Sequence, residues 1–341
     1  MTKKNILLLF TLIVLIAAGY YYSVQPNSTL NNAVSDFAIK DTAAIQKIHI
    51  ADLNGNDVVL ERQKNGFWLL NKNHHAKDHA ITSLLETLYR LQVQGPVQAS
   101  MKPRVMKRLA TTHRLVEIFT DDLEFPEKTY YIGDATMNHM RTFILLETKE
   151  NGKSSDPFIV EDYTTKGFLT PRFHAIFDDW RNTTLFYYPN LDIKRIDVKF
   201  LKEENNSFSL FYNGENDIQI SNINNELITN IDAVIAKEYL LKYKRINFES
   251  YVDNKLTTIE IDSINMQKPD YEIVVTDNNE NKKSITLWKK DVGVKQEDFF
   301  GNEVNYDVDR MWGKTHLNNF VFAQYYTFDK LLVPVDYFKQ D

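Results

Sequence analysis

The chain has 341 residues, of which 43% are hydrophobic and 25% charged, and these fractions exclude an intrinsically disordered protein. Its net charge is −6, whereas nucleic-acid-binding proteins usually carry an excess of Lys and Arg that neutralises phosphates. We therefore expect no nucleic-acid partner. The absence of cysteine excludes disulfides, thiolate metal sites, cysteine nucleophiles and a lipoprotein anchor.

Residues 5–22 predict a single transmembrane helix. No charged residue occurs between Ile6 and Tyr22, and the length is at the short end of what spans a bilayer. Lys3 and Lys4 keep residues 1–4 in the cytoplasm by the positive-inside rule, and three tyrosines, Tyr20–Tyr22, suit the outer interface. We therefore expect a single-pass protein of a bacterial inner membrane, with the lipid bilayer as one partner and the C-terminal domains in the periplasm.

Two other interpretations of this segment stay open. A cleaved signal peptide is compatible with the small residues Ala17-Ala18-Gly19, but the apolar run is longer than usual and large tyrosines follow it directly. A buried core helix is disfavoured because the segment is terminal, apolar on every face and preceded by lysines. Residues 23–35 are polar and rich in turn formers, so they predict a short tether.

The remaining chain contains two similar halves, residues 36–181 and 182–341. Residues 45–50 and 193–198 both alternate apolar and polar side chains, as half-buried strands do. Each half continues into a hairpin with an Asn-Gly turn, at Asn65-Gly66 and at Asn213-Gly214. Three further segment pairs follow in the same order: 117–121 with 273–277, 129–132 with 285–288, and 158–160 with 320–322. This order predicts an internal duplication.

A helix is expected after the first hairpin of each half. In the first half the predicted apolar face comprises Ile81, Leu84, Leu85, Leu88 and Leu91, with Asp78 as N-cap and Gly95-Pro96 as the stop. In the second half it comprises Ile231, Val234, Ile235 and Leu241. The predicted fold class is therefore α+β: an N-terminal transmembrane helix followed by two duplicated, mainly antiparallel β domains, each with one or two packed helices.

Several segments of the first half also occur, in this order, in a known family. They are residues 35–39, 41–48, 60–62 with 68–71, 129–133 and, most specifically, 167–173. The chain thereby resembles the bacterial domain-of-unknown-function-4340 (DUF4340) proteins. The resemblance implies a single-pass envelope protein whose outer β-rich domain is a non-catalytic accessory to ABC-type transport or gliding-motility-like systems. It supplies no catalytic residues.

Two groups of residues are candidates for partner contact. The first is a loop, in which Pro171 adds rigidity and Arg172 offers its guanidinium either to a carboxylate of the same chain or to a partner. Its members are Gly167, Phe168, Leu169, Thr170, Pro171 and Arg172. The second is a basic patch that suits anionic lipid or an acidic partner: Lys102, Arg104, Lys107 and Arg108. The alternative for the patch is a solvated helix face balanced by Asp121, Asp122, Glu124 and Glu127.

No metal, cofactor or catalytic site is expected. His74, His75 and His79 have metal-compatible spacing without an evident third ligand. Residues 277–281 resemble a calcium loop, but Lys282 and Trp288 occupy the positions that need Gly and Glu. The acid pairs Asp121-Asp122 and Asp178-Asp179 are more typical of solvated turns than of glycoside chemistry.

These observations predict a non-catalytic, membrane-anchored extracytoplasmic binding or scaffold subunit. It would work with membrane proteins of an envelope complex. Two alternatives remain at this stage. One is a cell-surface glycan-binding module that exposes aromatics such as Trp68 or Trp312, and the other is an envelope glycan hydrolase.

Overall fold

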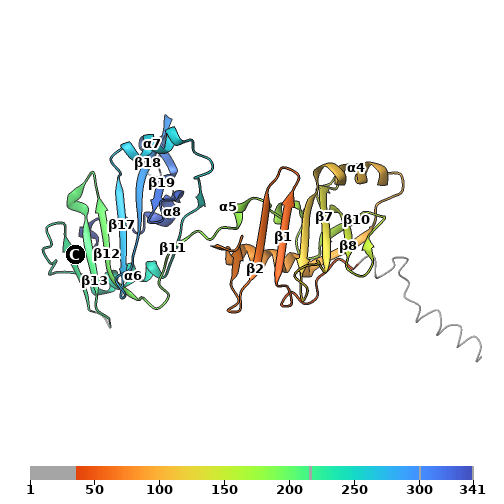
Figure 1. The fold of residues 1–341 in the computed structure, drawn as a ribbon. Helices are drawn as coiled ribbons and strands as arrows, with labels where there is room; N and C mark the ends of the chain where they lie inside the picture. The colour runs from red at the N-terminus through yellow and green to blue at the C-terminus, as the bar shows by residue number, and fades with distance from the viewer. Residues whose placement is uncertain (1–35, 215–216, 299–300, 340–341) are drawn as a thin grey trace, which may run out of the picture. The chain divides into compact units, whose positions relative to one another are not determined.

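The computed structural model describes residues 36–214, 217–298 and 301–339 (Figure 1). The predicted cytoplasmic N-terminus, transmembrane anchor and tether lie outside these ranges. Within them, none of the helices combines the length and the apolar character that crossing a membrane requires.

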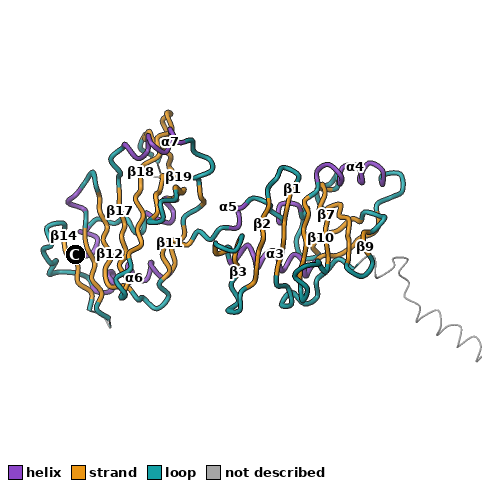
Figure 2. Tube along the Cα trace, viewed as in Figure 1, coloured by secondary structure: helices purple, strands orange, loops and turns teal. Residues whose placement is uncertain are grey.

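The chain divides into two compact units between Trp180 and Arg181, one residue from the boundary expected from the sequence. Each unit is built on a large sheet in which every strand pair is antiparallel, with a few short helices (Figure 2). The chain is therefore a strand-rich α+β protein. The two units are described separately.

The first unit contains a ten-stranded sheet in the order β4-β3-β2-β1-β6-β7-β8-β10-β5, with β9 paired to β8. The strands are β1 (Lys47–Asp52), β2 (Asp57–Arg62), β3 (Trp68–Leu70), β4 (His74–His75), β5 (Leu91–Pro96), β6 (Arg114–Phe119), β7 (Lys128–Ala135), β8 (Thr142–Thr148), β9 (Gly152–Lys153) and β10 (Phe158–Asp162). The helices are α3 (Asp78–Arg90), α4 (Lys102–Thr112), α5 (Phe177–Trp180) and the 3₁₀ turn η1 (Thr170–Arg172).

Helices cover both faces of this sheet. Because side chains alternate along a strand, the residues of β7 split between the faces: Tyr130 and Ile132 join the main core under α3, whereas Tyr131 joins a smaller cluster under α4. We call the α3 side the inner face and the α4 side the outer face. Helix α4 packs closely, since a Cβ on Gly133 would lie 2.7 Å from a methyl carbon of Leu109.

The first predicted helix ends earlier than expected. Leu91 does not belong to the helical face but begins β5, which pairs with β10, and Gly95-Pro96 lie in that strand instead of stopping the helix. Asp78 is the first helical residue, and the N-cap position belongs to Lys77, which provides no side-chain cap. Local periodicity could not anticipate β5, because its partner lies about seventy residues away in the chain.

Residues 36–39, here called the strap, lie against the inner face. Lys128 Nζ donates to the carbonyl oxygens of Asp36 (2.7 Å) and Ala38 (3.0 Å), and the Tyr130 hydroxyl donates to that of Phe37 (2.5 Å). The Phe37 ring is 1% exposed and packs edge-on against Phe158. The strap therefore fixes the first described residues to the core.

The second unit contains an eight-stranded sheet in the order β14-β13-β12-β17-β18-β19-β20-β16 and a separate β11-β15 pair. The strands are β11 (Thr184–Tyr187), β12 (Ile193–Phe200), β13 (Phe208–Tyr212), β14 (Ile218–Asn222), β15 (Arg245–Asn247), β16 (Ser250–Tyr251), β17 (Tyr271–Asp277), β18 (Lys282–Glu297), β19 (Glu303–Thr315) and β20 (Phe320–Gln324). The helices are α6 (Ala233–Leu241), α7 (Thr258–Met266) and α8 (Tyr325–Phe328), with 3₁₀ turns η2 (Glu204–Asn206), η3 (Lys242–Lys244) and η4 (Val335–Phe338).

The two large sheets have the same strand order. From β3 through β2, β1, β6, β7, β8 and β10 to β5, each strand of the first unit has a counterpart at the same place in the second sheet. Helix α6 contributes to the main core as α3 does, and α7 covers an outer cluster as α4 does. Every segment pair matched in the sequence falls on two such counterpart strands.

The residue-by-residue matches are nevertheless wrong in three strands. Ile118 faces the inner core, but its sequence match Val274 lies on the other face of β17, where Ile273 and Val275 are the inner residues. Likewise, the inner Phe158 was matched to Phe320, which packs under α7. The match of 129–132 with 285–288 has the same error, because it aligns the inner Ile132 with Trp288, which packs in the outer cluster. A one-residue slip exchanges the two faces of a strand.

The apolar face predicted for the second helix is only partly correct: Ile235 packs against the core from α6, and Ile231 does so from the residues before it. The buried residues of α6 are Ala236, Tyr239 and Leu240. Val234 and Leu241 are exposed, and Ile231 precedes the helix. The Tyr239 hydroxyl donates to the Leu331 carbonyl, so aromatic packing against the C-terminal segment sets the orientation of this helix.

Candidate interaction surface

The predicted loop at residues 167–172 is fastened to the sheet near the end of β7. The backbone N–H of Leu169 donates to Thr142 Oγ1 (2.7 Å), and the Thr170 hydroxyl donates to the Gly133 carbonyl (2.8 Å). Arg114 donates to the Thr170 carbonyl. Leu169 is completely buried. The centre of the loop is thus part of the core of the first unit.

Arg172 at the end of this loop pairs within the chain. Its Nη1 lies 2.7 Å from Oδ2 of Asp162, whose residue is 2% exposed, and 3.0 Å from Thr87 Oγ1. Burial alone would raise the pKa of Asp162. Hydrogen bonds from the Thr164 backbone and hydroxyl and from Arg172 outweigh burial, so the pKa of Asp162 is lowered and the carboxylate stays charged. Of the two roles considered for Arg172, the structure shows the intrachain pair.

Phe168 and Pro171 are the exposed residues of the loop. Phe168 is 37% exposed, and its ring centroid lies 6.0 Å from that of His139 in the β7–β8 turn. The loop therefore contributes an aromatic side chain beside this turn.

The predicted basic patch lies on α4, next to the same turn. Arg108 pairs with Asp134 (2.6 Å) and Lys102 with Asp156 (2.6 Å). Arg104 and Lys107 are exposed, and neither forms an ion pair with any residue in the described part of the chain. Two of the four cations are therefore not neutralised there.

The acids expected to balance the patch lie elsewhere. Residues 121–127 connect β6 to β7, at the start of β7, whereas α4 packs near its end. Asp122 pairs with Lys149 instead (2.8 Å). The predicted balancing of the patch by Asp121, Asp122, Glu124 and Glu127 is therefore wrong.

A groove of about 520 Å³ lies between α4 and the β7–β8 turn. Its charged and polar lining residues are Arg104, Arg108, Asp134, Thr136 and His139. Its apolar lining residues are Met101, Val105, Leu109, Ala135, Met137 and Phe143. Met137 is 95% exposed, and Met140 in the same turn is also exposed. Methionines adapt to partners of varied shape, and arginine binds carboxylates through two parallel hydrogen bonds. The groove suits a partner that is both acidic and apolar.

The basic residues also lie at the unfavourable end of their helix. Lys102 and Arg104 lie in the first turn of α4, which has no acidic residue there and no side-chain N-cap. Cations oppose the helix dipole at this end.

Arg104→Glu should stabilise α4, because it removes one such cation and adds an anion. We expect the helix to be stabilised by about 0.3–1 kcal/mol, which would be measured as slower hydrogen exchange of the α4 amides. The control is Lys64→Glu, the same charge change at an exposed turn. Faster exchange in the Arg104→Glu helix than in wild type would contradict the expectation.

The other predicted site residues do not come together. His74 and His75 are exposed on β4, with rings against Phe177 and Phe67, and His79 is exposed on α3. No group of three metal-binding side chains occurs among the described residues. The Asp277 carboxylate accepts backbone hydrogen bonds from Asn279 and Asn281 and so closes the β17–β18 turn.

The remaining predicted carboxylates and the tryptophans take part in local contacts. Asp179 lies 3.3 Å from His174. Trp68, Trp180 and Trp288 are buried, and the half-buried Trp312 stacks on Phe322 with 5.0 Å between centroids.

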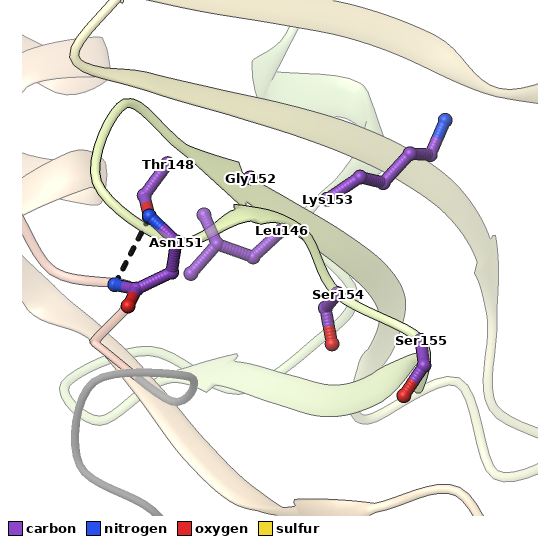
Figure 3. A pocket seen from close by; sticks show the side chains of 7 residues that line it. All are labelled: Leu146, Thr148, Asn151, Gly152, Lys153, Ser154 and Ser155. Carbon is purple, nitrogen blue, oxygen red and sulfur yellow. Dashed lines mark hydrogen bonds between the residues drawn. The ribbon is translucent and has the colours of Figure 1, made fainter.

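A second hollow, of about 290 Å³, lies at the β8–β9 turn (Figure 3). It is lined by Leu146, Thr148, Asn151, Gly152, Lys153, Ser154 and Ser155. Its one titratable side chain, Lys153, lies over the Tyr131 ring (3.6 Å). The hollow lacks the methionines and the arginines of the groove at α4, so we favour the groove as the interaction surface.

Sequence reasoning missed a histidine that lies between two carboxylates on the outer face. His49 Nδ1 lies 2.7 Å from Glu117 Oε2, and its Nε2 lies 3.1 Å from Asp57 Oδ1. The hydrogen bond with Glu117 is the largest influence and outweighs burial, so the pKa of His49 is raised. Alternation along β1 and β6 places His49 and Glu117 on one face, but their pairing depends on register.

This cluster predicts a pH-dependent stability difference. Protonated His49 donates to both carboxylates, so its contribution is fully present below its unfolded pKa of about 6.5 and is lost as pH rises through the raised folded pKa. The difference in unfolding free energy between wild type and His49→Gln should therefore be largest in mild acid and shrink towards alkaline pH. Denaturant titrations across that range measure it. A difference that grows with pH would contradict this sign.

Comparison of the chain with protein-family models, curated proteins and solved structures finds no match.

Proposed function

We propose that this chain is a non-catalytic binding and scaffold subunit, anchored in the inner membrane by residues 5–22, with both β-rich units in the periplasm. It would be an accessory to an ABC-type transport or gliding-motility-like complex. The observation that carries the proposal is the groove at α4, where Arg104, which forms no ion pair within the described ranges, adjoins the exposed Met101 and Met137. Such a surface suits the binding of a partner.

Three further observations support the proposal. The N-terminal residues are apolar and preceded by lysines, as single-pass anchors are. The strap fixes the chain to the first unit directly after the tether. The shared strand order of the two sheets fits duplication of one binding module, and the segments quoted above resemble those of the DUF4340 proteins.

The alternatives receive less support. A glycan-binding surface usually presents aromatic rings, but three of the four tryptophans are buried. A hydrolase needs two carboxyl groups facing one cleft, whereas Asp122 and Asp179 pair with Lys149 and His174.

The test is recovery of the full-length chain from mildly solubilised membranes of its host. We expect it to co-purify with integral membrane transport components, and a reporter at its C-terminus to be active only outside the cytoplasm. Recovery of the chain without such components, or a reporter active only in the cytoplasm, would contradict the proposal.

A further inference from the structure

The chain contains a segment whose chemistry complements its own groove. Residues 121–127 read Asp-Asp-Leu-Glu-Phe-Pro-Glu and connect β6 to β7. Leu123 is 55% exposed and Phe125 58% exposed, with the exposed acids Asp121 and Glu124 beside them. An acidic turn that presents two large apolar side chains to solvent is what the groove would recognise.

This acidic segment is held in one conformation. The Asp122 carboxylate accepts the backbone N–H groups of Glu124 (2.9 Å) and Phe125 (3.1 Å). Lys47 Nζ donates to the Leu123 carbonyl (2.5 Å), and Lys149 holds the other Asp122 oxygen (2.8 Å). A preformed turn loses little conformational entropy on binding.

The groove presents the opposite charges with a matching apolar surface. Arg104 lines the groove and has no ion-pair partner in the described ranges, whereas Arg108 is paired with Asp134 in the same lining. Met101 and Met137 supply adaptable apolar contacts. Charge complementarity of this kind selects partners and orients them during encounter.

A chain cannot fill its own groove with this segment. The acidic segment adjoins Lys128 at the start of β7, and the groove adjoins Ala135 at its end. Seven residue steps of a strand separate them by roughly 23 Å. The complementary segment must therefore come from another molecule.

We propose that the acidic segment of one copy docks into the groove of a second copy. Leu123 and Phe125 would lie against the methionines. Asp121 and Glu124 would face Arg104. The inference rests on the proposed scaffold function and gives the groove its partner: another copy of this chain.

The contact joins two different patches of the surface, so a pair that makes it once keeps one free groove and one free acidic segment and extends into rings or rows. A single turn in a groove buries less surface than a stable dimer needs, so association is weak in dilute solution. Confinement in a membrane raises the effective concentration of the copies and so strengthens their association.

Cysteine cross-linking tests the contact directly, because the chain has no cysteine of its own. Full-length Leu123→Cys and Met137→Cys chains are reconstituted together in vesicles and oxidised. The control pairs Leu123→Cys with Leu53→Cys, which is 55% exposed in the β1–β2 turn at the groove end of the sheet. We expect the first pair to cross-link at least about tenfold faster, as for an oriented encounter. Equal rates would overturn the proposal.

A charge exchange tests the ion pairs. Arg104→Glu in the Met137→Cys chain should lower the cross-linking rate about tenfold, and Asp121→Lys with Glu124→Lys in the Leu123→Cys chain should restore it. Lys64→Glu in the Met137→Cys chain should change nothing. A reversal without effect, or a loss that the second reversal does not restore, would overturn the proposal.

The result separates this inference from the proposed function. If the groove binds lipid headgroups instead, the charge reversal in the groove lowers the fraction of the chain that floats with anionic vesicles. The cross-linking rate then stays unchanged, and this result overturns docking between copies. Docking between copies without co-purified transport components would contradict only the accessory role.

Discussion

Replacing Arg172 with alanine is expected to destabilise the first unit by about 3–5 kcal/mol, because the buried Asp162 carboxylate then loses its only cationic partner among the described residues. The expected loss also includes the hydrogen bond from Arg172 to Thr87. The two units have separate cores, so hydrogen exchange followed peptide by peptide is the suitable measurement. Protection should fall across residues 36–180 and stay unchanged across residues 181–339.

A neighbouring pair provides the matched control. Glu161 precedes Asp162 on β10 and bonds Arg141 at 2.6 Å, but both side chains are partly exposed. Exposed pairs contribute about 0–1 kcal/mol, so Arg141→Ala should have little effect. If Arg141→Ala and Arg172→Ala destabilised the first unit equally, burial of Asp162 would not explain the effect of Arg172→Ala.

A double variant identifies the cause of the loss. Asp162→Asn keeps an acceptor for Thr164 and removes the charge, so Asp162→Asn with Arg172→Ala should be more stable than Arg172→Ala alone. A double variant less stable than Arg172→Ala would mean that packing of the arginine matters more than its charge.

The sequence contains enough information to predict several of the strands and their order along the chain, because alternation and Asn-Gly turns are local signals. Residues 45–50 and 193–198 fall on β1 and β12, which hold the same place in their sheets. The slips at Ile118 and Phe158 show the limit of such signals. Aromatic and β-branched residues occur on both faces where helices cover both, so residue type does not identify the inner face.

The candidate site illustrates the same limit. The basic residues of α4 and the loop at 167–172 were both evident in the sequence, but nothing local indicates that they meet. Their proximity follows from the hydrogen bonds that attach the loop to Thr142 and Gly133 and from the close approach of Leu109 to Gly133. The pairing of Arg108 with Asp134 follows from the same packing. Register and helix docking are properties of the whole sheet.

Phe37→Ala should be the second strongly destabilising substitution, with an expected cost of about 3–5 kcal/mol for removing a buried aromatic ring. The ring packs between Tyr130 and Phe158 on the inner face, and the adjoining backbone bonds Lys128 and Tyr130. The expected readout is faster hydrogen exchange in β7 and β10.

Phe125→Ala provides the control, since it removes the same ring from an exposed position and should change the unfolding free energy by no more than about 0.5 kcal/mol. The second unit supports a core role for the strap. Its strand β11 occupies the corresponding place before β12 and buries Leu185 and Phe186. A cost below about 1 kcal/mol for Phe37→Ala would show that the strap is peripheral.

The functional consequence of the strap follows from its position. It joins the proposed tether to the start of β7, beside Lys128, whereas the groove lies at the end of the same strand. Under the proposed function, a strap that stays bound sets how far the groove can lie from the proposed anchor at residues 5–22. Releasing it should add length to the tether and expose the first residues of the unit. Limited proteolysis of full-length Phe37→Ala in vesicles should cut near residues 36–45 faster than in wild type, with Phe125→Ala cut at the wild-type rate.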